Sequence, residues 1–225
     1  MSFTALSSGT RRAFHARSSR QFRRPPVMPM PTRVFLVCHA SHDHDTMLVG
    51  RMPGTGLTED GIRESRRLAR KLARHGIARV QSSPRQRALE TARIIAKAAK
   101  VPIDITFCLD DVDFGAWTGM SLTDLAKDPG WQRWTMMRSL ACSPDGECAR
   151  DVQSRVMRQF GRVHAANPGG SVAFVTHPEV IRMAAAHCHG ISLDRCDEID
   201  VPLASVTMVS VVRSGSELVT TAESL

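Results

Sequence analysis

The stretch RVFLVCHASHDHD, Arg33 to Asp45, decides the fold of this chain. Its first five residues, 33–37, form an apolar run of strand length, which is typical of a strand covered on both faces of a sheet. Cys38 and His39 follow at once, and imidazoles then alternate with carboxylates before any helix can begin. The stretch therefore predicts a buried strand that ends in a group of reactive side chains.

Strand and helix patterns alternate along the rest of the chain. Apolar runs predict further strands over 77–82, 103–107, 171–176, 205–213 and 217–221, the last two forming a hairpin. Helical periodicity predicts helices over 58–75, 84–100 and 147–166, and another from 178 onward. We therefore expect an α/β fold, a three-layer sandwich with a mostly parallel central sheet and helices on both faces.

Local signals place the helix ends. Thr58 can cap the first helix, and Gly76 can stop it. Ser83-Pro84 and His177-Pro178 each put proline at the first position of a helix, where its missing N–H costs nothing.

The side chains of two further segments allow more specific predictions. In the helix over 84–100 we expect Leu89, Ile94 and Ile95 to face inward. Residues 120–146 are the least regular part of the chain, and their tryptophans and methionines suggest a small helical cap.

Length and charge indicate one folded domain with a basic extension. The 225 residues suffice for one sizeable core. The formal net charge is +8, but residues 1–31 hold six arginines and no carboxylate, so the remaining 24 basic and 22 acidic residues leave only +2. This balance does not favour nucleic acid as a partner. We expect one folded domain over 32–225 after a disordered Arg/Ser-rich extension over 1–31.

The extension has two other interpretations. Its arginines and serines fit an organelle transit peptide, and Met28 or Met30 could instead be the true start of the protein. The sequence predicts no oligomeric state.

The cysteines and the hydropathy bear on the compartment. Six cysteines occur without a C-x-x-C pair, which favours free thiols in a reducing cytoplasm. No apolar run approaches the roughly 18 residues that span a bilayer, so no membrane partner is expected. We expect a cytoplasmic protein, with organelle targeting by residues 1–31 left open.

Three predicted strands end in groups that suit phosphate chemistry. Cys38-His39 follows the first strand, Ser82-Ser83 and the helix with Arg87 follow the second, and His177 follows the strand over 171–176. The carboxyl ends of parallel strands lie along one edge of a sheet, where ligands bind. Helix N-termini at two of these ends favour a bound anion.

These residues lie in motifs that resemble one family. The motifs are LVCHA (36–40), Arg51-x-x-Gly54, LTEDG (57–61), SSPRQRALETA (82–92), LDDVDFGAWTG (109–119), PDGE (144–147) and VTHPEVIR (175–182). In this order and spacing the chain resembles the histidine phosphatase superfamily, which includes the cofactor-dependent phosphoglycerate mutases, from about Arg33 to Val212. The resemblance implies the phosphoglycerate mutase-like form of the sandwich.

The resemblance also implies roles for individual residues. His39 would be the nucleophile that forms a phosphohistidine, which water then cleaves. His177 would contact the transferring phosphoryl oxygens, and Arg87 would clamp the phosphate. The general-acid position falls on Asp111, with Asp110 and Asp113 as alternates.

One departure from the family concerns the phosphate grip. The family's Arg-His-Gly is Cys38-His39-Ala40 here, so an arginine beside the nucleophile is missing. Arg51, His42 or His44 could replace its charge. Asp45 stands where relatives often have asparagine, and we expect it to face solvent.

Other chemistry at this loop is less favoured. Cys38 lacks the arginine six residues on that a cysteine phosphatase needs, so a small buried thiol is the better interpretation. His42 and His44 alone do not provide the three or four ligands of a zinc site, and we expect no metal. His187 and His189 are expected at a helix end or on the surface.

The sequence therefore predicts a metal-independent hydrolase without a cofactor. Its substrate would be a small phosphorylated metabolite, a phosphomonoester cleaved through phosphohistidine. One alternative is a catalytically impaired relative that binds a phosphorylated ligand, because Cys38 and Asp111 both depart from the family pattern. A second alternative is phosphoryl transfer of the phosphoglycerate mutase type.

Overall fold

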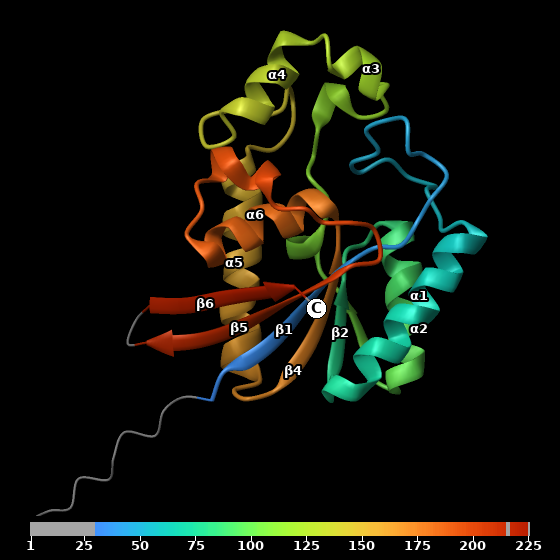
Figure 1. Cartoon of the computed structure of the whole chain (residues 1–225), viewed down its shortest axis with the longest axis vertical. Helices are drawn as coiled ribbons and strands as arrows, with labels where there is room; N and C mark the ends of the chain where they lie inside the picture. The colour runs from blue at the N-terminus through green and yellow to red at the C-terminus, as the bar shows by residue number, and fades with distance from the viewer. Residues whose placement is uncertain (1–29, 215–216, 225) are drawn as a thin grey trace, which may run out of the picture.

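The computed structural model describes residues 30–214 and 217–224, and these form a six-stranded sheet between helices (Figure 1). The strand order is β3-β2-β4-β1-β5-β6. Four neighbouring strands are parallel, namely β3 (Ile103–Ile105), β2 (Arg79–Ser82), β4 (Ser171–Thr176) and β1 (Thr32–Cys38). The hairpin of β5 (Val206–Ser214) and β6 (Glu217–Ser224) adds an antiparallel edge. The predicted α/β sandwich is confirmed.

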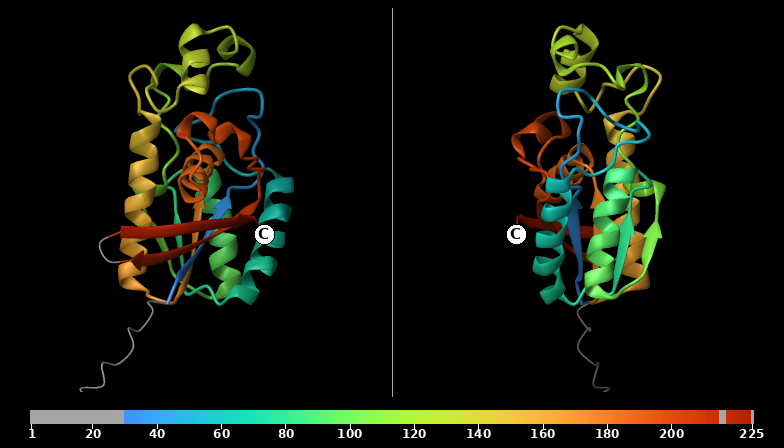
Figure 2. Two further views of the ribbon diagram at one scale, coloured as in Figure 1. Left: turned by 60° about the vertical axis from the view of Figure 1, so that its left-hand side comes forward. Right: turned by 90° about the vertical axis from the view of Figure 1, so that its right-hand side faces the viewer.

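The sheet is covered on both faces, as Figure 2 shows. Two helices, α1 (Glu59–Leu72) and α2 (Gln86–Ala99), pack against the side chains of Phe35 and Val37. On the other face α5 (Ala149–Ala166) and α6 (Pro178–His189) pack against Val34, Leu36 and Cys38. Successive side chains of β1 thus face opposite layers of helices, and both faces are buried. This explains why the residues of β1 form an unbroken apolar run.

A small helical cap stands beyond the carboxyl ends of the parallel strands (Figures 1 and 2). It contains α3 (Leu122–Leu125) and α4 (Pro129–Met136), which confirms the expectation for residues 120–146. Trp131 and Trp134 of α4 pack against Phe114 and Trp117 with tilted or edge-to-face rings. The apolar residues of the cap therefore extend the hydrophobic core on the α5 side of the sheet.

The helix starts follow the sequence signals with one exception. Thr58 caps α1 by accepting from Gly61 N, and α6 begins at Pro178 directly after His177. The second helix begins at Gln86, two residues later than Ser83-Pro84 predicted. Ser83 lies before the helix, where its hydroxyl contacts the distant side chains of His177 and Asp110. These tertiary contacts could not be predicted from the local sequence.

The inward face of α2 also differs from the prediction. Ile95 is buried, but Leu89 and Ile94 are only half-buried. The fully buried positions on this helix are taken largely by small residues, Ala88, Ala92 and Ala96 among them. Small side chains let α2 pack closely against the sheet, and Arg87 in its first turn is buried there.

The prediction of six free cysteines is wrong for one pair. Cys142 and Cys148 form a disulfide, with their Cα atoms 3.9 Å apart across an isolated antiparallel bridge. The five residues between them form a turn that brings the two thiols together, which the separation of six positions did not reveal. Cys38, Cys108, Cys188 and Cys196 are free.

Some expectations concern residues outside those that the structure describes. The interpretations of the Arg/Ser-rich extension fall almost wholly on residues 1–29, and Gly215 and Ser216 of the hairpin turn also lie outside. Within the described ranges, no helix combines the length and apolarity needed to cross a membrane.

Candidate active site

Strand ends and helix starts bring four side chains from distant parts of the sequence together. His39 follows β1, His177 follows β4, and Arg87 lies in the first turn of α2. Asp111 lies on the irregular segment after β3. All four side chains are buried, so their polar atoms interact in a region of low dielectric.

Arg87 connects the other three residues. Its Nε donates to His39 Nε2 at 3.2 Å, while Nη2 donates to Asp111 Oδ2 at 2.6 Å and contacts His177 Nδ1 at 3.2 Å. Nη2 also donates to the carbonyl of Gly50 at 2.8 Å. Nη1 is buried and has no hydrogen-bond partner among the described residues. A buried guanidinium nitrogen of this kind is a ready donor for an incoming anion.

His39 is held as a neutral imidazole with one nitrogen directed at Arg87. Nδ1 lies 2.9 Å from the carbonyl of Ala40, so Nδ1 carries the proton and Nε2 carries the lone pair. Burial, reinforced by the charge of Arg87, keeps the pKa of His39 well below its ordinary 6.5. Nε2 is therefore available as a nucleophile at neutral pH.

His177 is fixed between Ser83 and Asp111. Its Nε2 lies 2.8 Å from Ser83 Oγ, and its Nδ1 lies 3.3 Å from Asp111 Oδ2. Burial, with the nearby charge of Arg87, holds the pKa of His177 well below 6.5. Ser83 Oγ also reaches Asp110 Oδ1 at 3.3 Å, so the hydroxyl can donate there and accept from His177 Nε2.

The three candidate acids have different surroundings. Asp111 lines the cavity and contacts Arg87, and burial raises its pKa above the ordinary 3.8 against the opposing effect of that arginine. Asp110 accepts two hydrogen bonds from Arg85, at 2.7 and 2.9 Å. Asp113 is half-exposed and paired with Arg51. Of the three, only Asp111 is placed beside His39 and His177.

Arg51 lies outside the cavity rather than in it. Nε donates to the Asp111 carbonyl at 2.9 Å, Nη1 to Asp113 at 3.2 Å and Nη2 to Glu147 at 2.8 Å. The structure thus does not bring Arg51 to the phosphate position anticipated for it. Its contacts instead hold the segment that carries Asp111.

The remaining residues of the opening stretch divide between core and rim. Cys38 is fully buried, and burial raises the pKa of its thiol far above the usual range, which excludes a thiolate nucleophile there. The rings of His42 and His39 are tilted to each other with a centroid distance of 5.3 Å, and Asp45 is exposed as expected. His187 and His189 are exposed in the last turn of α6. No group of three or more potential metal ligands gathers within the described part of the chain.

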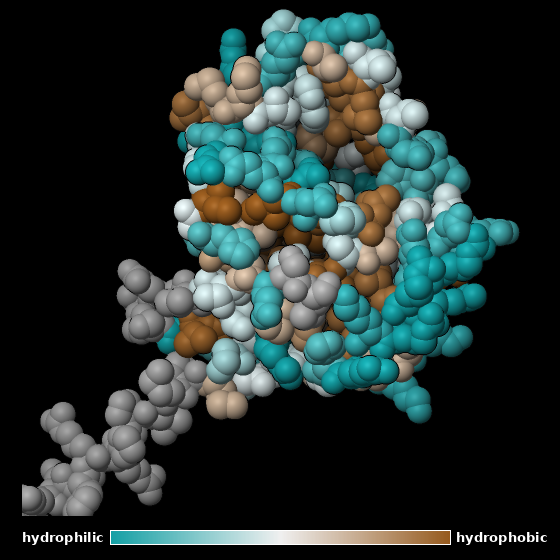
Figure 3. All heavy atoms as spheres, in the orientation of Figure 1, coloured by the Kyte–Doolittle hydropathy of each residue, from teal (hydrophilic) through white to brown (hydrophobic). Residues whose placement is uncertain are grey.

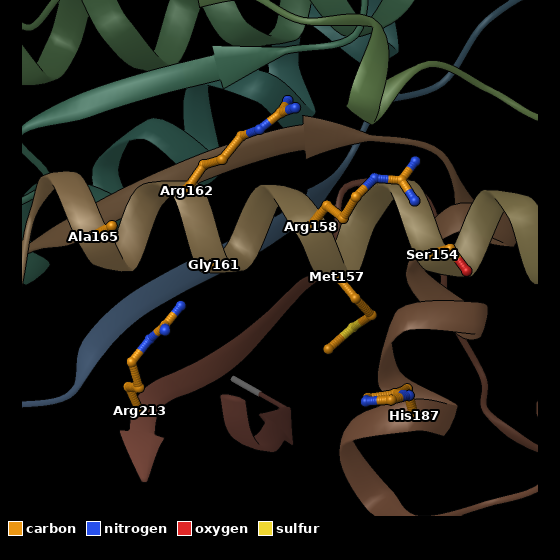
Figure 4. Close-up of a pocket in the computed structure, with 8 residues that line it drawn as sticks. All are labelled: Ser154, Met157, Arg158, Gly161, Arg162, Ala165, His187 and Arg213. Atoms are coloured by element: carbon orange, nitrogen blue, oxygen red, sulfur yellow. The ribbon is translucent and has the colours of Figure 1, made fainter. Parts of the chain in front are cut away.

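Two hollows in the surface differ in what they contain. A cavity of about 520 Å³ includes His39, Arg87 and Asp111. A larger hollow of about 740 Å³ runs along α5, where Figure 4 shows Arg158, Arg162 and Arg213 around it. The larger one holds exposed arginines but none of the four buried residues, so the smaller cavity is the candidate active site.

Several residues support the site, and of these Ser83 was singled out from the sequence but Arg85, Thr91 and Arg155 were not. Ser83 positions His177, Arg85 holds Asp110, and Thr91 accepts from the backbone N–H of Ala40. Arg155 on α5 donates to the Asp111 carbonyl at 3.1 Å. The motif SSPRQRALET contains the first three of these residues, so the motif as a whole was a usable signal.

A comparison of the whole chain with protein families agrees with this geometry. The model of the histidine phosphatase superfamily (branch 1) matches residues 34–224. The chain belongs to the histidine phosphatase superfamily.

The chain is also similar to individual proteins of other organisms. It is 36% identical over 157 residues to bifunctional protein Rv2228c of Mycobacterium tuberculosis, a match that covers 68% of this chain and 43% of that protein. It is 28% identical over 167 residues to phosphoserine phosphatase 1 of Hydrogenobacter thermophilus, covering 72% and 77% respectively. The chain therefore spans less than half the length of the mycobacterial relative.

The fold is also found in solved structures. YhfR of Bacillus stearothermophilus matches with a TM-score of 0.75 and 25% sequence identity, covering 83% of this chain and 94% of that protein. This agreement in fold supports the superfamily assignment independently of the motifs.

Proposed function

We propose that this protein is a phosphomonoesterase that transfers the phosphoryl group of its substrate to His39 and then to water. The observation that carries the proposal is the arrangement around Arg87. This one guanidinium contacts His39, His177 and Asp111, and its Nη1 is left without a partner. A phosphate oxygen bound at Nη1 would meet a donor that is already positioned.

Substrate binding would also release the nucleophile. Nε2 of His39 accepts from Arg87 Nε, so its lone pair is occupied while the site is empty of phosphate. A phosphate dianion competes for the same guanidinium and frees this lone pair. Nε2 then attacks phosphorus as the bond to the alcohol oxygen breaks, with the buried His177 contacting a phosphoryl oxygen.

Asp111 is proposed as the acid for the departing alcohol. Its raised pKa keeps a larger fraction of the carboxyl protonated than an exposed aspartate would have. The neighbouring His177 Nδ1, 3.3 Å from Asp111 Oδ2, can accept a hydrogen bond from the protonated form. The proton passes to the alcohol oxygen, and Asp111 becomes a carboxylate.

The second half of the reaction reverses the role of Asp111. The carboxylate takes a proton from water, whose oxygen attacks phosphorus and breaks the P–N bond to His39. Inorganic phosphate leaves, His39 regains its lone pair, and Asp111 is again protonated. The cycle needs only residues of this chain and one water molecule.

A second candidate function is binding of a phosphorylated ligand without turnover. Cys38 favours it, because a fully buried thiol occupies the position of the family's motif arginine. A lost hydrogen bond to a charged group corresponds to about 10- to 100-fold in rate or affinity.

The decisive experiment measures phosphate release from a panel of phosphomonoesters by the full chain and by His39→Ala. We expect turnover by the parent and a loss of at least about 1,000-fold in the variant, because no other described side chain offers a neutral nitrogen at this position. His189→Ala is the matched control, since that imidazole is exposed and distant from the cavity.

Equal rates for the parent and His39→Ala would contradict the proposed nucleophile. Binding of phosphomonoesters without release of phosphate, together with hydrolysis gained in Cys38→Arg, would assign the protein to the second function instead.

A further inference from the structure

The mouth of the catalytic cavity differs in character from its floor. The floor is polar, with His39, Arg87 and Asp111, whereas the outer lining includes the apolar side chains Met47, Leu48, Leu122, Val201 and Leu203. Leu122 and Leu203 are 45% and 39% exposed, so the mouth offers apolar surface that a ligand could cover. Figure 3 shows hydrophobic surface on both sides of a hollow between the cap and the rest of the molecule.

One apolar wall is held in place by backbone hydrogen bonds. Leu48 N donates to the carbonyl of Met120, Gly119 N donates to that of Leu48, and Leu122 N donates to that of Thr46, at 2.8 to 3.0 Å. The loop after β1 and the start of the cap are therefore joined like two short strands. This wall needs little rearrangement to receive a ligand.

The segment before β5 supplies a second apolar surface. Ala204 has a φ of +54°, a left-handed conformation that alanine rarely adopts, and its N–H donates to the carbonyl of His39 at 3.0 Å. This anchor fixes Leu203 at the rim, directly beside the nucleophile's backbone. A strained turn that exposes a leucine would be a poor arrangement unless something covers that leucine.

The charges of the mouth offer little to an anionic leaving group. The lining contains two arginines, and Arg87 is committed to the floor. Arg182 is paired with Glu179 through Nη1 and donates from Nε to the carbonyl of Ile199. Asp45, also in the lining, would repel a second negative charge.

We propose that the substrate of this site is a phosphomonoester with an uncharged, apolar alcohol group, which Leu122, Met47 and Leu203 cover while the phosphate contacts Arg87. This inference rests on the proposed function, because it describes the leaving group of the same reaction. The cavity volume of about 520 Å³ accommodates a phosphate together with a ring or a short hydrocarbon chain.

The test uses three alkyl phosphates with similar leaving groups, so that their chemistry differs little. They are 2-phenylethyl phosphate, propyl phosphate and 2-carboxyethyl phosphate, and kcat/KM is measured for each with the full chain. We expect 2-phenylethyl phosphate to exceed propyl phosphate by about tenfold, and 2-carboxyethyl phosphate to be the poorest of the three.

Variants then connect this preference to the mouth. Leu122→Ser and Leu203→Ser should each bring 2-phenylethyl phosphate closer to propyl phosphate, by about three- to tenfold in the ratio. Leu140→Ser is the control, because Leu140 is an exposed cap leucine, at 71%, that does not line this cavity. Equal effects of all three variants would point to general damage and overturn the assignment of the mouth.

Other outcomes separate this inference from the proposed function. If 2-carboxyethyl phosphate is the best substrate and Arg182→Gln removes that advantage, the site selects acids and the inference is wrong while the phosphatase function stands. If none of the esters is hydrolysed, calorimetry with 2-phenylethyl- and propylphosphonate tests the mouth alone. Tighter binding of the phenylethyl compound would support the apolar mouth without the function, and equal binding would refute it.

Discussion

Arg87 is buried to 99%, and its position determines what each of its neighbours can do. Burial of a cation is costly unless partners compensate it, and Asp111 compensates Arg87 at 2.6 Å. The same contact leaves His39 and His177 beside a positive charge, which adds to burial in lowering their pKa values. One arginine thus adds to the effect of burial on two imidazoles and holds one carboxyl beside them.

The role of Asp111 predicts a dependence on the leaving group. Asp111→Asn should lower kcat/KM for propyl phosphate by about 100- to 10,000-fold, because a propoxide leaving group needs a proton. The loss for p-nitrophenyl phosphate should be much smaller, because nitrophenolate departs without one. Steady-state kinetics with both esters measures the difference.

Asp113→Asn serves as the comparison for this prediction. Asp113 was an alternate for the acid, but it is half-exposed and bound to Arg51, so its loss should affect both esters alike. A leaving-group-dependent loss in Asp113→Asn, and none in Asp111→Asn, would transfer the acid role to Asp113.

At the scale of elements, the loop over 142–148 is hydrogen-bonded to the segment over 111–116, which carries Asp111. Glu147 N donates to the Asp113 carbonyl at 2.8 Å, and Ala116 N donates to that of Pro144 at 3.0 Å. The loop and the segment are so close that a Cβ on Gly115, which has a φ of +53°, would lie 1.8 Å from the Pro144 oxygen. The Cys142–Cys148 disulfide closes the loop over 142–148.

Removal of this disulfide should therefore reduce stability. For a loop of this length the entropy of the unfolded chain accounts for about 2 kcal/mol, so Cys142→Ser/Cys148→Ser should lower the free energy of unfolding by about that amount. Urea denaturation of the parent with and without reductant, beside the double variant and a Cys108→Ser control, provides the measurement. A parent protein whose stability is the same in both conditions would contradict the prediction.

At the scale of the whole molecule, the site joins residues that are 138 positions apart in sequence, from His39 to His177. The parallel strands β1 and β4 are direct neighbours, with Cys38 paired to Thr176, so their ends place the two histidines with ring centroids 5.1 Å apart. The cap and the loop before β5 close the space above them. The ends of the strands position the polar floor of the cavity, and the surrounding loops form its mouth.

The two buried histidines predict how global stability varies with pH. Their pKa values are lowered on folding, so the unfolded chain binds more protons below pH 6.5 and stability falls as the pH decreases through that value. At pH 5.5 each histidine should cost on the order of 1 kcal/mol relative to pH 7.5. Urea denaturation at both values measures the loss, which should be smaller in His39→Gln and unchanged in the exposed His189→Gln.

An opposite trend would contradict the neutral state of the site. Asp111 acts in the other direction, because its raised pKa makes the folded chain bind more protons than the unfolded chain above pH 3.8, and stability gained from it decreases as the pH rises. Asp111→Asn removes this contribution, so a net increase in the stability of that variant between pH 7.5 and pH 5.5 would mean that His39 and His177 are charged when folded.

The sequence by itself determined the order of strands and helices and the residues at the strand ends. Those features depend on short-range patterns, such as the apolar run over 33–37, the Thr58 cap and the proline after His177, whose physical effect is local. The buried alanines of α2 were missed because alanine carries little hydrophobic signal, although it permits close packing.

Only the tertiary structure decided which polar side chains meet. The contact of Asp111 with Arg87, the placement of Arg51 outside the cavity and the Cys142–Cys148 bond each depend on competition among partners that are distant in sequence or on the path of a loop. Such competition is resolved by distances of a few tenths of an ångström in a packed interior. A pattern along one chain specifies where a side chain begins, whereas packing in three dimensions specifies what it contacts.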